Sequence, residues 1–440
     1  MDNLDRSPVT LIDVLANSVV LRQLAPYIPI RSLLALSATN KSVREYFTSQ
    51  PEPWRHLDLT GTTTAIVDSS PIDVGGVSWR AERMDESLTE DDFYAGPLRG
   101  IFGRLHQKRI LGNVQTLVLD GLSVPADLVR EIVAEDRYRV KILSLRECGN
   151  LNPTKLQQVL RYITRPTRAE GTPRLKALYF FGRKDTTRSA LCRHSKSSTS
   201  SSLGVMESEG AQIGAEWNRR SSTALSTCIC DDETKWYGSA GKILKRPLSD
   251  WPDTLRACKG LIAFDAVLCR GPRHDITKVN SENFLQPSIA TVALGGKGCE
   301  SCGSCPEGPA VFGECSESML PLLSPPPSHS STVRAAQYPQ TTKEAFPKLL
   351  LRCEDCLRGR WCERCNRWWC EDCYKDPVSR MHMRTEMQQL EAREDLREGG
   401  WETLTSRTTG PAVKVYSKLC VEHCLVGEMM SGAGSNGMWG

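Results

Sequence analysis

The chain has 440 residues, of which 40% are hydrophobic and 25% charged, so it has material for two or three globular domains. Its formal net charge is only +4, and no basic stripe is interleaved with aromatic residues, which gives no support for a nucleic-acid partner. No apolar run reaches the length of a membrane span, and the N-terminus lacks the basic flank of a signal peptide. We therefore expect a cytoplasmic or nuclear protein, in which 18 cysteines favour metal sites over disulfides.

The first expected unit is helical and covers residues 8–60. Apolar residues recur at helical spacing, two prolines end the first helix, and a second apolar helix follows. The segment VLANSVVLRQLAPYIPIRSLLALSATNKSVREYF, followed by PEPWRHLDL, resembles an F-box. It departs from that family at Leu15-Ala16, where F-boxes usually have Leu-Pro. A generic helical hairpin is the alternative interpretation.

The F-box resemblance implies a partner, the Skp-type adaptor, and through it the cullin complex of a ubiquitin ligase. An apolar face of the helices would dock this adaptor. The candidate docking residues are Pro29, Ile30, Leu33, Leu34 and Leu36. A protein of this kind selects a protein substrate, whose identity is unknown, and performs no chemistry itself.

Residues 61–100 are polar and rich in acidic side chains, which predicts a loop or insertion. From 101 to 315 we expect an irregular α/β region, because a strand, a turn and a helix recur. Leu117 and Leu143 correspond at a 26-residue step, and LSLRECGNLN resembles the core of a leucine-rich repeat. PRLKALYFF is a third strand, and GLIAFDAVLC and PSIATVALGG are candidates for a fourth and a fifth.

Stacked repeats of this kind present a concave surface along their strands, and we expect this surface and the zinc module described below to hold the substrate. An ordinary α/β domain with a parallel sheet is the alternative. Two segments interrupt the order. Residues 184–250 include a serine-rich stretch and predict a disordered insertion. Residues 316–347 contain a run of three prolines and predict a semi-rigid linker.

The last expected unit is a zinc-binding module over residues 348–428. It opens with three consecutive CxxC pairs, each of which can supply two thiolates to one tetrahedral ion. The pairs are Cys353 and Cys356, Cys362 and Cys365, and Cys370 and Cys373. Two closed sites need eight ligands, and SKLCVEHCL supplies the fourth pair, which is Cys420 with either Cys424 or His423.

Neighbouring pairs are too close together to wrap one ion, which favours an interleaved arrangement. We expect the first pair to join the third at one ion and the second pair to join the fourth at another. This pattern resembles the cross-brace zinc fingers of the RING, ZZ and FYVE types, apart from the long gap before Cys420. Tryptophans 361, 368 and 369 would pack over the metal sites or, in the RING interpretation, grip a conjugating enzyme.

A second cysteine cluster lies upstream, in GKGCESCGSCPEGPAVFGEC. Its members are Cys299, Cys302, Cys305 and Cys315, with Cys258 and Cys269 as alternative partners. A third zinc ion, an iron–sulfur cluster and unligated thiols are the three interpretations of this cluster. The seven histidines are scattered and form no catalytic constellation.

The sequence thus predicts a multidomain α+β protein. It would have an F-box-like helical unit, a leucine-rich-repeat-like region, long disordered insertions and a small module holding two or three structural zinc ions. The expected function is that of a non-catalytic substrate-recognition adaptor in a cullin-type ubiquitin ligase. The alternatives are a RING-like ligase acting through the zinc module and a zinc-stabilised interaction scaffold.

Overall fold

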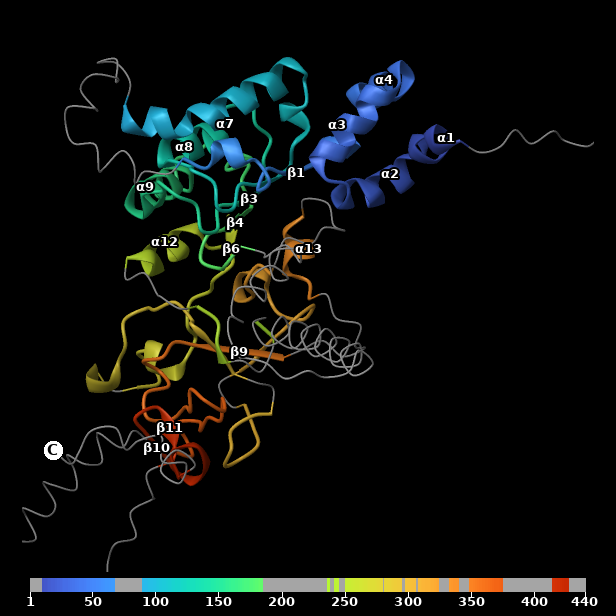
Figure 1. Ribbon diagram of the computed structural model, residues 1–440. Coiled ribbons are helices and arrows are strands. Elements are labelled where there is room, and N and C mark those ends of the chain that lie inside the picture. Colours follow the sequence, from blue (N-terminus) through green and yellow to red (C-terminus); the bar gives the residue numbers. More distant parts are fainter. Residues whose placement is uncertain are drawn as a thin grey trace, which may run out of the picture. The chain divides into compact units, whose positions relative to one another are not determined.

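A computed structural model shows a mixed α/β protein that folds as two compact units (Figure 1). The structure describes residues 10–67, 89–184, 236–237, 241–244, 250–279, 281–294, 297–305, 308–323, 332–339, 348–374 and 414–426. The first unit comprises Met1–Glu209, Asp250–Val267 and Cys315–Thr342, and the second comprises Gly210–Ser249, Leu268–Glu314 and Lys343–Gly440. Among the described residues, no helix combines the length and the apolar character that crossing a membrane requires.

The first unit begins with short helices whose ends are fixed by polar caps. They are α1 (Leu11–Ala16), α2 (Ser18–Leu24), η1 (Ala25–Tyr27), α3 (Ile30–Thr39), α4 (Lys41–Ser49) and η2 (Glu52–Trp54). Asn17 and Asn40 accept backbone N–H bonds at the starts of α2 and α4, as N-cap residues do. The Tyr46 hydroxyl donates to the Leu15 carbonyl at 2.7 Å, which joins α4 to α1. The helices therefore pack around their own small core.

A five-stranded parallel sheet follows, and its strands add in chain order. They are β1 (His56–Asp58), β2 (Thr116–Val118), β3 (Ile142–Ser144), β4 (Ala177–Tyr179) and β6 (Ala263–Phe264). The register aligns one buried row of side chains across all five strands, which consists of Leu57, Leu117, Leu143, Leu178 and Phe264. The β6 segment was the candidate fourth repeat strand, and it takes that place beside β4.

Among the described residues, one α-helix precedes each of the four strands that follow β1 in this sheet. These helices are α7 (Glu90–Gln107), α8 (Ala126–Ala134), α9 (Pro153–Ile163) and α12 (Trp251–Cys258). They follow one another along the sheet in the same order as the strands (Figure 1). Part of α7 falls in residues 61–100, which we expected to be a loop. Thr89 and Asp92 form a capping box there, and the acidic residues of the first turn stabilise the positive end of the helix dipole.

The other face of this sheet is covered by the chain's own residues. Leu322 and Ala336 are buried against Ile142, Ala177 and Tyr179, which belong to β3 and β4. The backbone N–H of Leu322 donates to the Phe264 carbonyl at 2.8 Å. The described part of the expected linker therefore contains the short helix α13 (Val333–Gln337) and contributes to the core of the first unit.

The second unit is built on a four-stranded antiparallel sheet in the order β5-β7-β9-β8. The strands are β5 (Gly241–Lys242), β7 (Val292–Leu294), β9 (Lys348–Arg352) and β8 (Ala310–Val311). A hairpin of β10 (Val415–Tyr416) and β11 (Leu419–Cys420) leads into a π-helical turn (Val421–Leu425). The candidate fifth repeat strand is β7, so it belongs to this sheet. Most of the expected insertion 184–250 lies outside the described residues, although β5 falls within it.

Candidate metal centres

Three groups of four Cys or His side chains gather in the second unit. Within each group the ligand atoms all lie within 4.8 Å of one another. The first cluster is Cys269, His274, Cys353 and Cys356. The second cluster is Cys299, Cys302, Cys370 and Cys373, and the third cluster is Cys362, Cys365, Cys420 and Cys424. Each cluster therefore contains one of the three CxxC pairs and takes its other two ligands from elsewhere in the chain.

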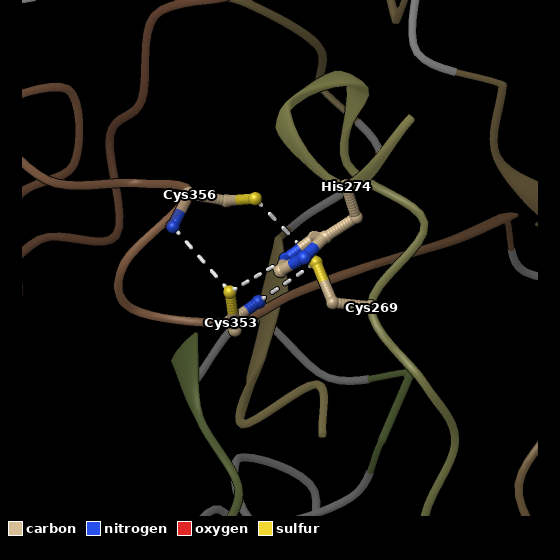
Figure 2. A group of neighbouring side chains, drawn as sticks. All are labelled: Cys269, His274, Cys353 and Cys356. Carbon is tan, nitrogen blue, oxygen red and sulfur yellow. Dashed lines mark hydrogen bonds between the residues drawn. The ribbon is translucent and has the colours of Figure 1, made fainter. Parts of the chain in front are cut away.

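Strand pairing assembles the first cluster. Residue 268 forms a bridge with Ile289 just before β7, and β7 pairs with β9, whose last residue precedes Cys353. Cys269 is thereby brought to Cys353, whose backbone N–H donates to the Cys269 sulfur at 3.2 Å. The Cys269 and Cys356 sulfurs lie 3.7 Å apart. Figure 2 shows the four side chains converging on one point from two separate stretches of chain.

The imidazole of His274 is oriented by its second nitrogen. Nδ1 lies 3.1 Å from the carbonyl oxygen of Leu285, which can only accept, so Nδ1 carries the proton. Nε2 then carries the lone pair that can bind a metal ion, and it faces the Cys353 sulfur at 3.2 Å (Figure 2). A backbone carbonyl that fixes the histidine tautomer is a common support for metal-binding histidines.

Gly271 lies against this cluster and leaves no room for a side chain. Its backbone angles, φ −61° and ψ 150°, suit any residue, so only space is limiting. A Cβ atom there would lie 2.6 Å from the Cys356 sulfur and 3.3 Å from Cδ of Arg352. The cluster therefore requires glycine at this position because of close packing.

We expect Gly271→Ala to displace the Cys356 thiolate and to weaken metal binding at the first cluster by about tenfold or more, since overpacking costs roughly 1–3 kcal/mol. The other two clusters should keep their ions. Native mass spectrometry under competition with a chelator gives the count. The matched control is Gly112→Ala, where an added Cβ meets nothing within 4 Å. Equal metal retention in the two variants would contradict the packing argument.

The second cluster forms where a tight turn meets the third CxxC pair. The Cys299 N–H donates to the Ser304 carbonyl at 2.8 Å and closes the turn. The backbone N–H of Cys370 donates to the Cys299 sulfur at 3.2 Å, and the Cys302 and Cys370 sulfurs lie 3.8 Å apart. Hydrogen bonding with Ser304 lowers the pKa of Cys302 to about 6. Cys302 and Cys373 are exposed, so this is the most open of the three clusters.

The third cluster joins the middle CxxC pair to the C-terminal hairpin. The backbone N–H of Glu363 donates to the Lys418 carbonyl at 2.9 Å, which holds the hairpin turn against the pair. The sulfurs of Cys365 and Cys420 lie 3.7 Å apart. Burial would raise the pKa of Cys362, but hydrogen bonds from backbone N–H groups, including that of Cys365, outweigh it and lower the pKa to about 7.

The sulfur–sulfur distances suit a shared tetrahedral ion. A tetrahedron with metal–sulfur bonds of about 2.3 Å has sulfur–sulfur edges of about 3.8 Å. One sulfur pair in each of the three clusters lies at 3.7, 3.8 and 3.7 Å, respectively. A disulfide would need about 2.05 Å, and the described cysteines are free thiols. The three clusters can therefore hold metal ions without rearrangement of these sulfur pairs.

Thiols this close cannot all ionise without a cation. In the first cluster, burial would raise the pKa of Cys269, but hydrogen bonds from Cys353 and Cys356 hold that pKa well below its usual range. Hydrogen bonding to Cys269 in turn raises the pKa of Cys356. Burial raises the pKa of Cys370 and of Cys424 in the other clusters. A divalent ion supplies the positive charge that lets every thiol in a cluster become a thiolate.

The core of the second unit combines several of these ligands and three tryptophans with aliphatic residues of β7 and β9. Trp361, Trp368 and Trp369 are 4%, 2% and 4% exposed, and they pack with Cys299, Cys362, Cys370 and Cys420. Arg360 is also buried and donates to the carbonyl of Trp369 at 2.9 Å. Its guanidinium also forms an ion pair with Glu371 at 3.2 Å, which balances the buried positive charge.

The structure separates residues that we expected at one ion. Cys353 and Cys356 do not meet Cys370 and Cys373, because the pairing of β7 with β9 brings upstream ligands to each pair. The middle pair does meet Cys420 and Cys424, whereas His423 is exposed and lies outside the cluster.

In the upstream cysteine cluster the outcome is divided. Cys299 and Cys302 enter the second cluster, while Cys305 and Cys315 belong to none of the three groups. His274 was missed, because it looked like one scattered histidine. Its spacing of five positions from Cys269, ahead of a CxxC pair, was the available signal.

The N-terminal candidates for adaptor docking are distributed between surface and core. Pro29 and Leu34 are exposed, Ile30 and Leu36 are half-buried, and Leu33 lies in the core of the helical segment at 3% exposure. Comparison of the whole chain with protein-family models, with curated proteins and with solved structures found no match.

Proposed function

We propose that the chain is the substrate-recognition adaptor of a cullin-type ubiquitin ligase. In this proposal the N-terminal helices form an F-box that docks a Skp-type adaptor. The parallel-sheet region is a short leucine-rich-repeat array, which the one-directional order of its strands supports. The clusters hold structural zinc, which prefers closed tetrahedral sites of thiolates and imidazole and suits the reduced cytoplasm or nucleus.

One observation carries the docking part of the proposal. The helices between residues 11 and 34 keep large apolar side chains on their surface although they have a core of their own. The most exposed are Leu11, Val19, Leu24, Tyr27 and Leu34, at 62%, 68%, 41%, 57% and 40%. These five side chains fall within residues 11–34, and in this proposal they form the apolar contact surface for the adaptor. An adaptor that covers these side chains would remove their apolar surface from water, and this burial would stabilise the complex.

The double variant Leu24→Asp with Leu34→Asp tests this. Burying two leucines contributes about 3 kcal/mol or more, so we expect the full-length variant to bind a recombinant Skp-type adaptor about a hundredfold more weakly. Thermal unfolding should remain cooperative with a small shift in midpoint, because neither side chain belongs to the buried core.

The matched control for this variant is Ile66→Asp, because Ile66 is 54% exposed and lies outside the helices. Failure of the wild-type chain to capture the adaptor, or capture by the double variant at wild-type strength, would reject the proposal.

The RING-like alternative is less well supported. It needs tryptophan surface to grip a conjugating enzyme, and the indoles of Trp361, Trp368 and Trp369 are nearly fully covered. Two of the three clusters also draw ligands from residues 269–302, which is not the arrangement of a contiguous cross-brace finger. A zinc-stabilised interaction scaffold would share the metal sites but would not bind the adaptor.

A further inference from the structure

We infer that one edge of the parallel sheet is the binding surface for an acidic segment of a partner protein. The edge consists of the four segments that lead from a helix into the next strand, residues 108–115, 135–141, 164–176 and 259–262; we call it the basic edge. This inference rests on the proposed function in one respect only, that the bound segment belongs to a substrate.

The charge of this edge is far from the average of the chain. Its four segments contain ten Lys or Arg residues and three Asp or Glu residues, a net charge of +7, while the whole chain carries +4. The rest of the protein is therefore net acidic, and the positive charge is concentrated at this place. Such a field attracts acidic partners and speeds their association.

Helix dipoles explain only part of this charge. The C-terminal ends of helices favour cations, but the effect falls off within the last turn. Lys141 and Lys176 stand immediately before β3 and β4, well beyond the ends of α8 and α9. They repeat a local pattern, since Arg139-Val140-Lys141 leads into β3 and Arg174-Leu175-Lys176 leads into β4.

The two lysines are neighbours across the sheet, which has a cost in stability. The backbone N–H of Lys176 donates to the Lys141 carbonyl at 2.7 Å, so the like charges lie side by side where the adjacent strands β3 and β4 begin. Like charges placed side by side in a sheet are destabilising. No ion pair within the described chain engages Arg139, Lys141 or Lys176, although Arg174 is paired with Asp136. A repeated charge pattern that leaves three of its four cations without an ion pair among the described residues and sets two like charges side by side is expected at a functional surface.

The strand face does not compete for this role. In a repeat array a partner would be expected on that face, but Leu322 and Ala336 of the same chain cover it at β3 and β4. The opposite edge has the wrong sign, because it carries Asp58, Glu147 and the acidic first turn of α7. Recognition of an acidic segment therefore falls to the basic edge.

A protein segment fits this edge better than a nucleic acid does. Single strands are held by aromatic rings on which bases stack, interleaved with basic side chains. Tyr162 is the exposed aromatic residue that the described chain offers beside this edge, and Arg165 already lies over its ring at 3.9 Å. Carboxylates need no stacking partner, and they pair with Arg and Lys directly.

The test uses the full-length, metal-loaded protein and a fluorescein-labelled oligoglutamate peptide. We expect anisotropy to show binding that weakens as salt is raised, because exposed charges are screened. The triple variant Arg139→Glu, Lys141→Glu and Lys176→Glu should bind about tenfold to a hundredfold more weakly. The control variant, Lys348→Glu with Arg183→Glu and Lys184→Glu, makes the same change in net charge outside the four segments of this edge and should bind like the wild type.

Several results would overturn the inference: no binding of oligoglutamate by the wild type, equal weakening in both triple variants, or tighter binding of a single-stranded oligonucleotide than of the peptide. Capture of the Skp-type adaptor is measured on the same variants. Since the three substituted residues, Arg139, Lys141 and Lys176, lie on β3 and β4 approaches and not in the N-terminal helices, adaptor binding should be unchanged. Loss of peptide binding alone therefore counts against the basic edge, and loss of adaptor binding by the wild type counts against the proposed function.

Discussion

Removal of the metal ions from the intact protein is expected to unfold the second unit and to leave the parallel sheet of the first unit folded. The reason lies in the composition of the second core, in which four clustered cysteines and three tryptophans make up seven of the thirteen buried residues. In zinc-finger peptides one structural ion contributes roughly 10–16 kcal/mol, as much as the whole stability of an ordinary domain. Without the ions, the buried thiols would also have to stay protonated.

Hydrogen exchange followed by mass spectrometry distinguishes the two units. After treatment with a strong chelator, we expect amides in residues 348–374 to lose their protection, while those of β2, β3 and β4 keep it. The first unit serves as the internal control, because its described residues contain none of the three clusters. Restored protection on re-addition of zinc would show that unfolding follows metal loss. Full protection of residues 348–374 in a protein proven metal-free would contradict this expectation.

Local features of this fold are readable from the sequence. Leu117 and Leu143 mark equivalent strands because each repeat buries the same row, and the structure places them opposite each other. The CxxC pairs mark ligand pairs because two thiolates three residues apart fit one ion. Thr89 and Asp92 are also a local signal, because they form the capping box that starts α7. We expected a loop there because the composition around them is acidic.

The assignment of pairs to ions is not readable in this way, because it depends on contacts between distant residues. Spacing indicates that neighbouring CxxC pairs do not share one ion, but it does not show which distant residues complete each site. The pairing of β7 with β9 decides this for Cys353, which meets Cys269 instead of Cys370. A strand as short as β7 has too few residues for its hydrophobic pattern to show which strand it pairs with. Its sequence therefore resembled that of one more repeat strand.

His274 illustrates the same limit. An isolated histidine carries no signal of metal binding by itself, and only the folded chain shows that Leu285 orients its ring toward Cys353. The covered strand face was hidden for a related reason. A proline-rich composition predicts a spacer, whereas Leu322 and Ala336 within that segment are buried by packing that no local pattern encodes.

The central claim is that three metal ions bind and that two of them tie residues 269–302 to the C-terminal CxxC pairs. If this is correct, a fragment of residues 340–440 holds complete ligands for the third cluster only. Its other two CxxC pairs lack Cys269 and His274 in one case and Cys299 and Cys302 in the other. Half of a tetrahedral site binds an ion far more weakly than four ligands do, because open positions are left to water.

The most direct measurement is therefore the metal content of the full-length chain and of the 340–440 fragment, determined in parallel by native mass spectrometry and elemental analysis. We predict three zinc ions in the full-length protein and one tightly bound ion in the fragment. Two ions in both species would contradict the account, because that result would mean that the C-terminal CxxC pairs satisfy one another without the upstream ligands.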